Sequence, residues 1–518
     1  MKKIKNIFFL VILIAGFLVS ACDESTVDLD PIGANEVGYF NNESEMQKAV
    51  FGIYSSVRDF YSAQFNHGRP STWMWLAPSD DITTPSGNAE ETFAGITPDH
   101  RRSLNFYTYS YRLIARANTV IEVVDNRGDE IYELNPDLKD VHKGEALFLR
   151  AWAFWRLWNI FETAPIVTER IKLLNNAFPG NSEGTELLDQ AIADLKDAAA
   201  LLPESWDDAN KGRVTSNSAY GLLGKVYVFR GTVDNTMADF TAAIDAFDQI
   251  AGVSLTDHYN KNFNYEYENN EESLFEFQAG STLGGVNAFL SFVDFPGFDL
   301  TVYWGFFDQR PVWIGNDIMI ATDGLKSAFE DGDPRIPHVF NPNASGVTNI
   351  TKYVKDGAFA RNAAGGNLNP ARNNGYNINN PRILRYADIL LLKAEAIVRS
   401  GGNLADAVAL VNQIRTRARF STEDGMEAAV PANLDATSAD RPTVLEWIYE
   451  ERRRELAIEE GHRWWDLRRR HIAGEIDLKS WDFESMSSDF EFEDFNIRYP
   501  LPPNEVVENP NLNQNEGY

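Results

Sequence analysis

The chain contains a single cysteine, and it has few basic residues for its length. Among 518 residues, Lys and Arg together number 47, whereas Asp and Glu number 76, which gives a formal net charge of −29. A lone cysteine excludes an intrachain disulfide bond. The negative field repels nucleic acids and other polyanions, although salt screens it over about 10 Å. We therefore expect no nucleic-acid partner, and a neutral ligand is favoured.

Familiar catalytic motifs are also missing. The seven histidines are scattered, with no HExxH pair for zinc, no GxSxG turn and no GxxxxGK phosphate loop. Asp80 and Asp81 are neighbours in the chain, so they do not face each other across the about 5 or 9 Å that glycosidases use. Asp331 and Asp333 offer two carboxylates to calcium, but the full calcium-loop pattern is absent. We predict a binding protein rather than an enzyme, with no cofactor and with a structural calcium ion left open.

Long apolar stretches are confined to the N-terminus. Residues 7–19 are apolar, follow three lysines and end shortly before Cys22. This run is shorter than the about 20 residues of a membrane-spanning helix, and it is typical of a signal peptide. We predict a lipoprotein signal peptide over residues 1–21 and lipidation of Cys22 as the membrane anchor. Residues 22–43, rich in Asp, Gly, Asn and Pro, are expected to form an extended tether.

The rest of the chain carries helical periodicity. The whole sequence is 44% hydrophobic and contains 12 tryptophans, which suffices for a large core. Apolar residues recur at spacings of three and four across residues 111–251 and 382–419, and the helices come in pairs of about the 34 residues of a tetratricopeptide repeat. Residues 44–518 are predicted to form a single, mainly all-α domain of such pairs. The expected helices are Tyr111–Val124, His142–Phe161, Thr185–Leu202, Asn217–Gly231, Asp239–Ala251, Arg382–Gly401 and Leu404–Arg419.

A charged helix runs into two adjacent tryptophans within residues 445–470, which we call the C-terminal latch. Gly461 is predicted to end this helix. The turn expected after it carries Trp464 and Trp465 beside an arginine and carboxylate cluster. Large flat side chains next to paired charges favour a buried structural element over a reactive centre.

The latch contains the run ERRRELAIEEGHRWWDLRR, which resembles the C-terminal signature of the SusD/RagB family. Further segments resemble family motifs in the family's order, among them GEALFLRAWAFWRLWNIFETAPIV, RILRYADILLLKAEA and YPLPPNEVVENPNLNQNEGY. The family consists of nutrient-binding outer-membrane lipoproteins of Bacteroidetes. The resemblance implies a non-enzymatic protein, anchored by lipid and facing the cell exterior, with a SusC-like TonB-dependent transporter as its partner.

Residues 254–381 interrupt the helical pattern. Gly, Asn and Pro become frequent there, and short runs such as Ser273–Gln278 predict strands. A loop-rich segment of this length inside a globular chain is usually functional. We predict a loop-rich, ligand-facing insertion that contains short strands. Tyr61–Phe106 is a second aromatic-rich loop region.

Aromatic residues in these two loop regions define the candidate site. Trp152, Trp155 and Trp158 recur at helical spacing, so we assign them to the core. In loops, flat aromatic faces can stack on sugar rings while carboxylates and arginines bind the hydroxyls. The alternative is that each aromatic residue pins its loop to the body. The candidate ligand-binding residues are Trp73, Trp75, Asp80, Asp81, Tyr303, Trp304, Arg310 and Trp313.

Three functions fit these observations. The preferred one is capture of an oligosaccharide or polysaccharide and its delivery to the transporter, which predicts aromatic loops around one hollow. The second is peptide capture by a RagB-like lipoprotein, which predicts an extended groove with backbone-binding groups. The third is a repeat scaffold that binds only protein, which predicts a flat exposed aromatic patch.

Overall fold

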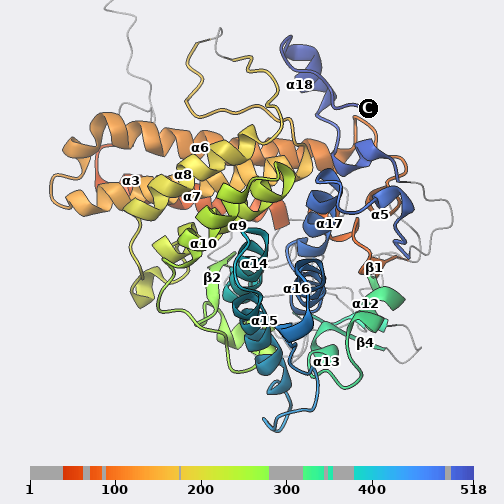
Figure 1. Ribbon diagram of the computed structural model, residues 1–518. Helices are drawn as coiled ribbons and strands as arrows, with labels where there is room; N and C mark the ends of the chain where they lie inside the picture. The colour runs from red at the N-terminus through yellow and green to blue at the C-terminus, as the bar shows by residue number, and fades with distance from the viewer. Residues whose placement is uncertain are drawn as a thin grey trace, which may run out of the picture.

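The computed structural model describes residues 39–61, 71–84, 89–173, 177–278, 319–342, 348–353, 379–484 and 492–518. Within these ranges the protein is mostly helical with a few short strands, as predicted (Figure 1). No helix in the described ranges is long and apolar enough to cross a membrane. The signal peptide, Cys22 and most of the tether lie outside them, and so do Tyr303, Trp304, Arg310 and Trp313.

The N-terminal half is a bundle of long helices that lie side by side in Figure 1. It comprises α3 (Glu43–Tyr61), α6 (Arg101–Ile131), α7 (Pro136–Ile160) and α8 (Glu186–Leu201). Helix α7 packs against both α6 and α8. The prediction of a helix over Tyr111–Val124 was too short, because α6 has 31 residues. Its buried face includes Ser103, Ser110 and Asn118, and these polar residues interrupt the apolar repeat from which helices are predicted.

Two of the predicted helix pairs follow this bundle in the chain. They are α9 (Ser216–Val233) with α10 (Met237–Phe247), and α14 (Tyr386–Arg399) with α15 (Leu404–Arg419). Helix α9 begins with a capping box in which the Thr215 hydroxyl accepts from the backbone N–H of Ser218. A Cβ added to Gly224 would collide with the Phe247 ring, so this glycine permits the close packing of α9 on α10. Helix α14 contacts both members of the first pair, which joins the two pairs into one stack.

The predicted helix Arg382–Gly401 starts four residues too early. Residues Arg382–Arg385 form strand β6, which pairs antiparallel with β2 (Ser273–Glu276) inside the predicted strand Ser273–Gln278. All four side chains of β6 are buried. Because the two arginines are buried along with the two apolar residues, no alternation of polar and apolar residues marks the strand, and periodicity could not distinguish it from the helix that follows.

The latch is two helices rather than a helix and a turn. Helix α16 (Arg441–Glu455) ends six residues before Gly461, and α17 (His462–Ile472) carries both tryptophans. Gly461 has φ of 74° and precedes the first residue of α17, so it starts a helix instead of ending one. A Cβ on Gly461 would lie 2.8 Å from the carbonyl oxygen of Trp75, which leaves room only for glycine. The predicted burial of Trp464 and Trp465 is confirmed, at 1% exposed each.

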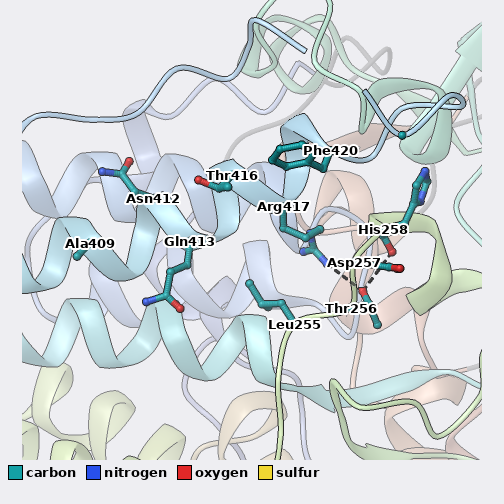
Figure 2. Close-up of a pocket in the computed structure, with 11 residues that line it drawn as sticks. Leu255, Thr256, Asp257, His258, Ala409, Asn412, Gln413, Thr416, Arg417 and Phe420 are labelled. Carbon is teal, nitrogen blue, oxygen red and sulfur yellow. Dashed lines mark hydrogen bonds between the residues drawn. The ribbon is translucent and has the colours of Figure 1, made fainter. Parts of the chain in front are cut away.

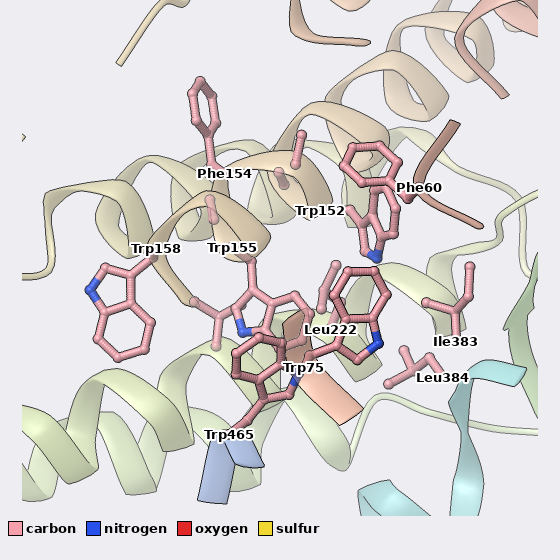
Figure 3. Packing of buried hydrophobic residues seen from close by; sticks show 14 of the residues in the cluster. Phe60, Trp75, Trp152, Phe154, Trp155, Trp158, Leu222, Ile383, Leu384 and Trp465 are labelled. Atoms are coloured by element: carbon pink, nitrogen blue, oxygen red, sulfur yellow. The ribbon is translucent and has the colours of Figure 1, made fainter. Parts of the chain in front are cut away.

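The core assignment of Trp152, Trp155 and Trp158 is also confirmed, because each is at most 3% exposed. Figure 3 shows these side chains projecting from α7 into the cluster of buried residues. The Trp152 ring meets the Phe60 ring edge-on at 5.0 Å between centroids. The indole N–H of Trp158 donates to the Gly184 carbonyl at 3.0 Å. These tryptophans are therefore not available as a sugar-stacking ladder.

The insertion and the earlier loop region meet in a small antiparallel sheet. Strand β1 (Ile82–Thr83) comes from the earlier region, and β3 (Ile320–Ala321), β4 (Phe340–Pro342) and β5 (Thr348–Ile350) come from the insertion. The strand order is β1-β3-β5-β4. The register pairs Ile82 with Ala321. The sheet thus brings the two predicted loop regions into contact.

The other short α-helices are α4 (Trp73–Leu76), α5 (Ala89–Thr92), α12 (Asp323–Ala328), α13 (Ile336–Val339) and α18 (Pro503–Glu508).

Candidate functional site

Trp73 and Trp75 were predicted to contact ligand, and the structure corrects this. Both belong to the short helix α4, and both are 0% exposed. The guanidinium of Arg156 lies 4.0 Å from the Trp75 ring centroid, and Gly461 of the latch abuts the same tryptophan. Because neither indole reaches the surface in this conformation, we replace the predicted ligand contact with a packing role.

Asp80 and Asp81 are likewise buried, which corrects the prediction that they form a polar rim around the ligand. Asp80 accepts two hydrogen bonds from Arg463, at 2.7 and 2.8 Å, and a third from the indole of Trp481 at 3.2 Å. Burial raises the pKa of Asp80, but the charge and hydrogen bonds of Arg463 outweigh this effect and bring the pKa to about 2. Asp81 accepts from Arg453 at 2.7 Å. The two aspartates therefore tie the latch to the segment that leads into β1.

Asp333, one of the two carboxylates considered for calcium, is a partner of Arg335. The guanidinium donates to its two carboxylate oxygens, with the shortest contact at 2.8 Å, and both side chains are 0% exposed. Asp331 is exposed. Among the described residues, no group of three or more His, Cys, Asp or Glu side chains is arranged to hold a metal ion.

A groove of about 890 Å³ opens elsewhere, between α15 and residues 255–258. This volume falls within the about 300–1,000 Å³ of typical ligand pockets. Figure 2 shows the side chains of α15 along one side and those of the 255–258 segment along the other. The lining residues are Leu255, Thr256, Asp257, His258, Ala409, Asn412, Gln413, Thr416, Arg417, Phe420 and Gly425.

The base of this groove is held by Arg417, whose charge is already neutralised. Its guanidinium donates to the Thr256 hydroxyl at 3.3 Å and to the Glu272 carboxylate at 3.1 Å, and it also pairs with Glu455. Burial raises the pKa of Glu272, but the charges of Arg417 and Arg385 outweigh burial and leave the pKa below its usual value. The carboxylates under Arg417 are therefore ionised, and the groove floor presents no net positive charge.

The end of the groove at His258 carries no unpaired charge. Burial lowers the pKa of His258, so the ring is neutral at neutral pH. Its Nδ1 accepts from the backbone N–H of Asn260 at 3.1 Å. The neighbouring Asp257 is exposed, and it forms an ion pair with Lys261 at 2.7 Å. Each charged group at this end thus has a partner of opposite sign.

None of the groove residues was named as a candidate from the sequence, although residues 255–258 fall within the predicted ligand-facing insertion 254–381. One usable signal was Phe420, a phenylalanine directly after the end of an amphipathic helix, and it is 41% exposed. The other wall, residues 255–258, lies about 150 positions earlier in the chain. Only the packing of the 255–258 segment beside α15 turns these two segments into one groove.

Taken together, the stacked helix pairs, the small sheet and the open groove define a helical repeat protein with features of a binding protein. The sequence profile of the SusD family matches residues 244–518, which is more than half of the chain. A second profile, described as starch-binding associating with outer membrane, matches residues 46–228. The chain therefore belongs to the SusD family, which confirms the resemblance carried by the latch.

Individual proteins agree with this assignment. A SusD-like protein of Formosa agariphila is 25% identical over 554 aligned positions, which cover 100% of both chains. A SusD-like protein of Bacteroides ovatus is 24% identical, over 88% of this chain and 81% of that protein. Among solved structures, a laminarin-binding SusD-like protein superposes with a TM-score of 0.71 at 22% identity, covering 92% of this chain and 100% of the other. A SusD homologue of Bacteroides thetaiotaomicron gives a TM-score of 0.72 at 19% identity, over 94% and 99% of the two chains.

Proposed function

We propose that this protein captures a neutral oligosaccharide or polysaccharide at the cell surface and delivers it to a SusC-like TonB-dependent transporter. The observation that carries the proposal is the pair of family profiles over both halves of the chain, one of them described as starch-binding and associated with the outer membrane. The laminarin-binding relative supports a glycan as the ligand class. The lone cysteine at the end of an N-terminal apolar run supports a lipid anchor, and the profile described as associating with outer membrane supports its location there.

In this proposal, Tyr303, Trp304, Arg310 and Trp313 contact the glycan. Aromatic faces gain stacking energy on the C–H faces of sugar rings, and an arginine can donate to several hydroxyls. Trp304 is followed by a glycine, which lets a ligand approach closely.

Affinity electrophoresis against a panel of neutral and anionic polysaccharides tests the proposal. We expect at least one neutral polysaccharide to retard the protein and sulfated or uronic-acid polymers to retard it less, because the net charge of −29 opposes anionic chains. A Trp304→Ala variant is expected to lose about 1–3 kcal/mol of binding, by analogy with base stacking on an aromatic ring. Its melting temperature should be unchanged. Retardation by no glycan, together with binding of peptides, would favour the peptide-capture alternative.

The proposed anchor makes a separate prediction. A Cys22→Ser variant is expected to lose labelling by radioactive palmitate and to accumulate as unlipidated protein in soluble or uncleaved form, because the thiol that carries the acyl chain is absent. A Ser25→Ala variant in the same segment is the control, and it should be labelled like the wild type. Continued labelling of the Cys22→Ser protein would show that the anchor lies elsewhere.

A further inference from the structure

The α15 wall of the groove carries no charged side chain apart from the buried and paired Arg417. Four α15 residues at spacings of one and three, together with Phe420 directly after the helix, line this wall. Exposed helix faces are normally rich in charged residues, and this protein has 24% charged residues overall. The solvent-facing positions of this wall are thus polar or apolar but uncharged. These residues are Ala409, Asn412, Gln413, Thr416 and Phe420.

This wall presents an exposed ring and an available amide. Phe420 lies at one end of the groove and is 41% exposed (Figure 2). Gln413 is exposed, and within the described ranges no internal hydrogen bond engages its side chain. By contrast, the Asn412 amide is engaged within the protein, since it accepts from the N–H of Leu434 at 2.8 Å and donates to the carbonyl of Leu434 at 3.0 Å. The loop that carries Leu434 is thereby held against α15, so the groove wall is preformed.

We infer that this groove is a second saccharide-binding site, separate from the proposed loop site. A flat apolar ring can stack on the C–H face of a sugar, and the Gln413 amide can both donate to and accept from its hydroxyls. The paired Arg417, the neutral His258 and the Asp257–Lys261 ion pair leave the groove without net charge. A neutral glycan chain fits this lining, and an anionic one finds no free cation among the groove's described residues.

The site rests on the proposed function, because it adds a second contact to the same glycan chain. Two sites on one protein bind a polymer more tightly than either site alone, provided that the chain can span them. The groove would thus hold a long glycan while the loop site engages another part of it. A short oligosaccharide gains no such advantage and reports each site by itself.

Titration calorimetry with a short neutral oligosaccharide, taken from a polymer that retards the wild type, tests the inference. The wild type should bind two equivalents. We expect Phe420→Ala to lower the affinity of one bound equivalent about tenfold and to leave the affinity of the other unchanged. Gln413→Ala should lower the affinity of the same equivalent. The matched control is Phe51→Ala on α3, whose ring is 44% exposed on another element, and this variant should bind like the wild type. All three variants should have the melting temperature of the wild type, because each replaced side chain is exposed.

The outcomes separate this inference from the proposed function. One equivalent in the wild type, or two unchanged equivalents in Phe420→Ala, overturns the second site and leaves glycan capture intact. Loss of peptide binding rather than glycan binding in Phe420→Ala overturns the saccharide assignment. Absence of binding to every glycan overturns both the second site and the proposed function. Trp304→Ala should weaken binding at the loop site, which is the equivalent that Phe420→Ala leaves unchanged.

Discussion

An Arg385→Met variant is expected to lose about 3–5 kcal/mol of unfolding free energy, because the substitution leaves buried carboxylates without their partner. Arg385 is 1% exposed and lies at the centre of an ionic network below the groove. Its guanidinium donates to Glu459, Glu272 and Glu455, each with a closest distance of 2.7 Å. Methionine keeps much of the side-chain length while removing all of these hydrogen bonds.

Glu272 and Glu455 of this network are ionised in the folded protein, because their pKa values lie below the usual value. Burial raises the pKa of Glu455, but the charges of Arg417, Arg385 and Arg335 outweigh it and bring the pKa to about 2. Removal of one guanidinium therefore leaves a negative charge in the interior, away from water. That desolvated charge, rather than the lost attraction alone, makes the expected effect large.

Urea unfolding followed by tryptophan fluorescence measures the effect. The control is Arg112→Met, which breaks an ion pair with Asp59 at 3.0 Å in which the arginine is 45% exposed. A pair with a solvated arginine contributes about 0–1 kcal/mol, and Arg116 still faces the 15% exposed Asp59, so the control should unfold close to the wild type. Equal urea midpoints for the two variants would mean that the buried network contributes no more to the unfolding free energy than a surface pair.

Trp465→Ala is the second variant with a large expected effect, a loss of about 3–5 kcal/mol from cavity formation and lost contacts. Trp465 is 1% exposed, and its indole N–H donates to the Glu460 carbonyl at 2.8 Å. In Figure 3 it projects from α17 toward Trp75 and Trp155, so it joins the latch to the core of the N-terminal bundle. The loss is a large share of the about 5–15 kcal/mol by which domains are stable.

Trp465→Ala should show a lower melting temperature in thermal unfolding and a lower midpoint in urea unfolding. The matched control is Trp447→Ala on α16, whose side chain is half-buried and whose removal should cost clearly less. At a temperature where Trp465→Ala is still folded, its glycan affinity should equal that of the wild type. Trp304→Ala should show the opposite pattern, with normal unfolding and weaker binding. A Trp465→Ala protein that unfolds like the wild type would contradict the structural role of the latch.

The sequence alone determined the helical architecture and most of its periodic helices. The predicted helix Leu404–Arg419 coincides with α15, and Thr185–Leu202 differs from α8 by one residue at each end. These segments have one buried and one solvated face, so the spacing of apolar residues records their conformation locally. The family resemblance of the latch was also readable from the sequence, because its residues are contiguous.

Only the tertiary structure decided which aromatic and charged residues are accessible. Trp73 and Asp80 have the composition of a ligand site, yet α4 is buried and Asp80 is bound by Arg463, 383 positions away in the chain. The groove likewise combines α15 with residues 255–258. Local sequence sets periodicity and turns, whereas burial and charge pairing depend on segments that meet only when the chain folds. For that reason the exposed Phe420, rather than the buried Trp73, lines an open groove.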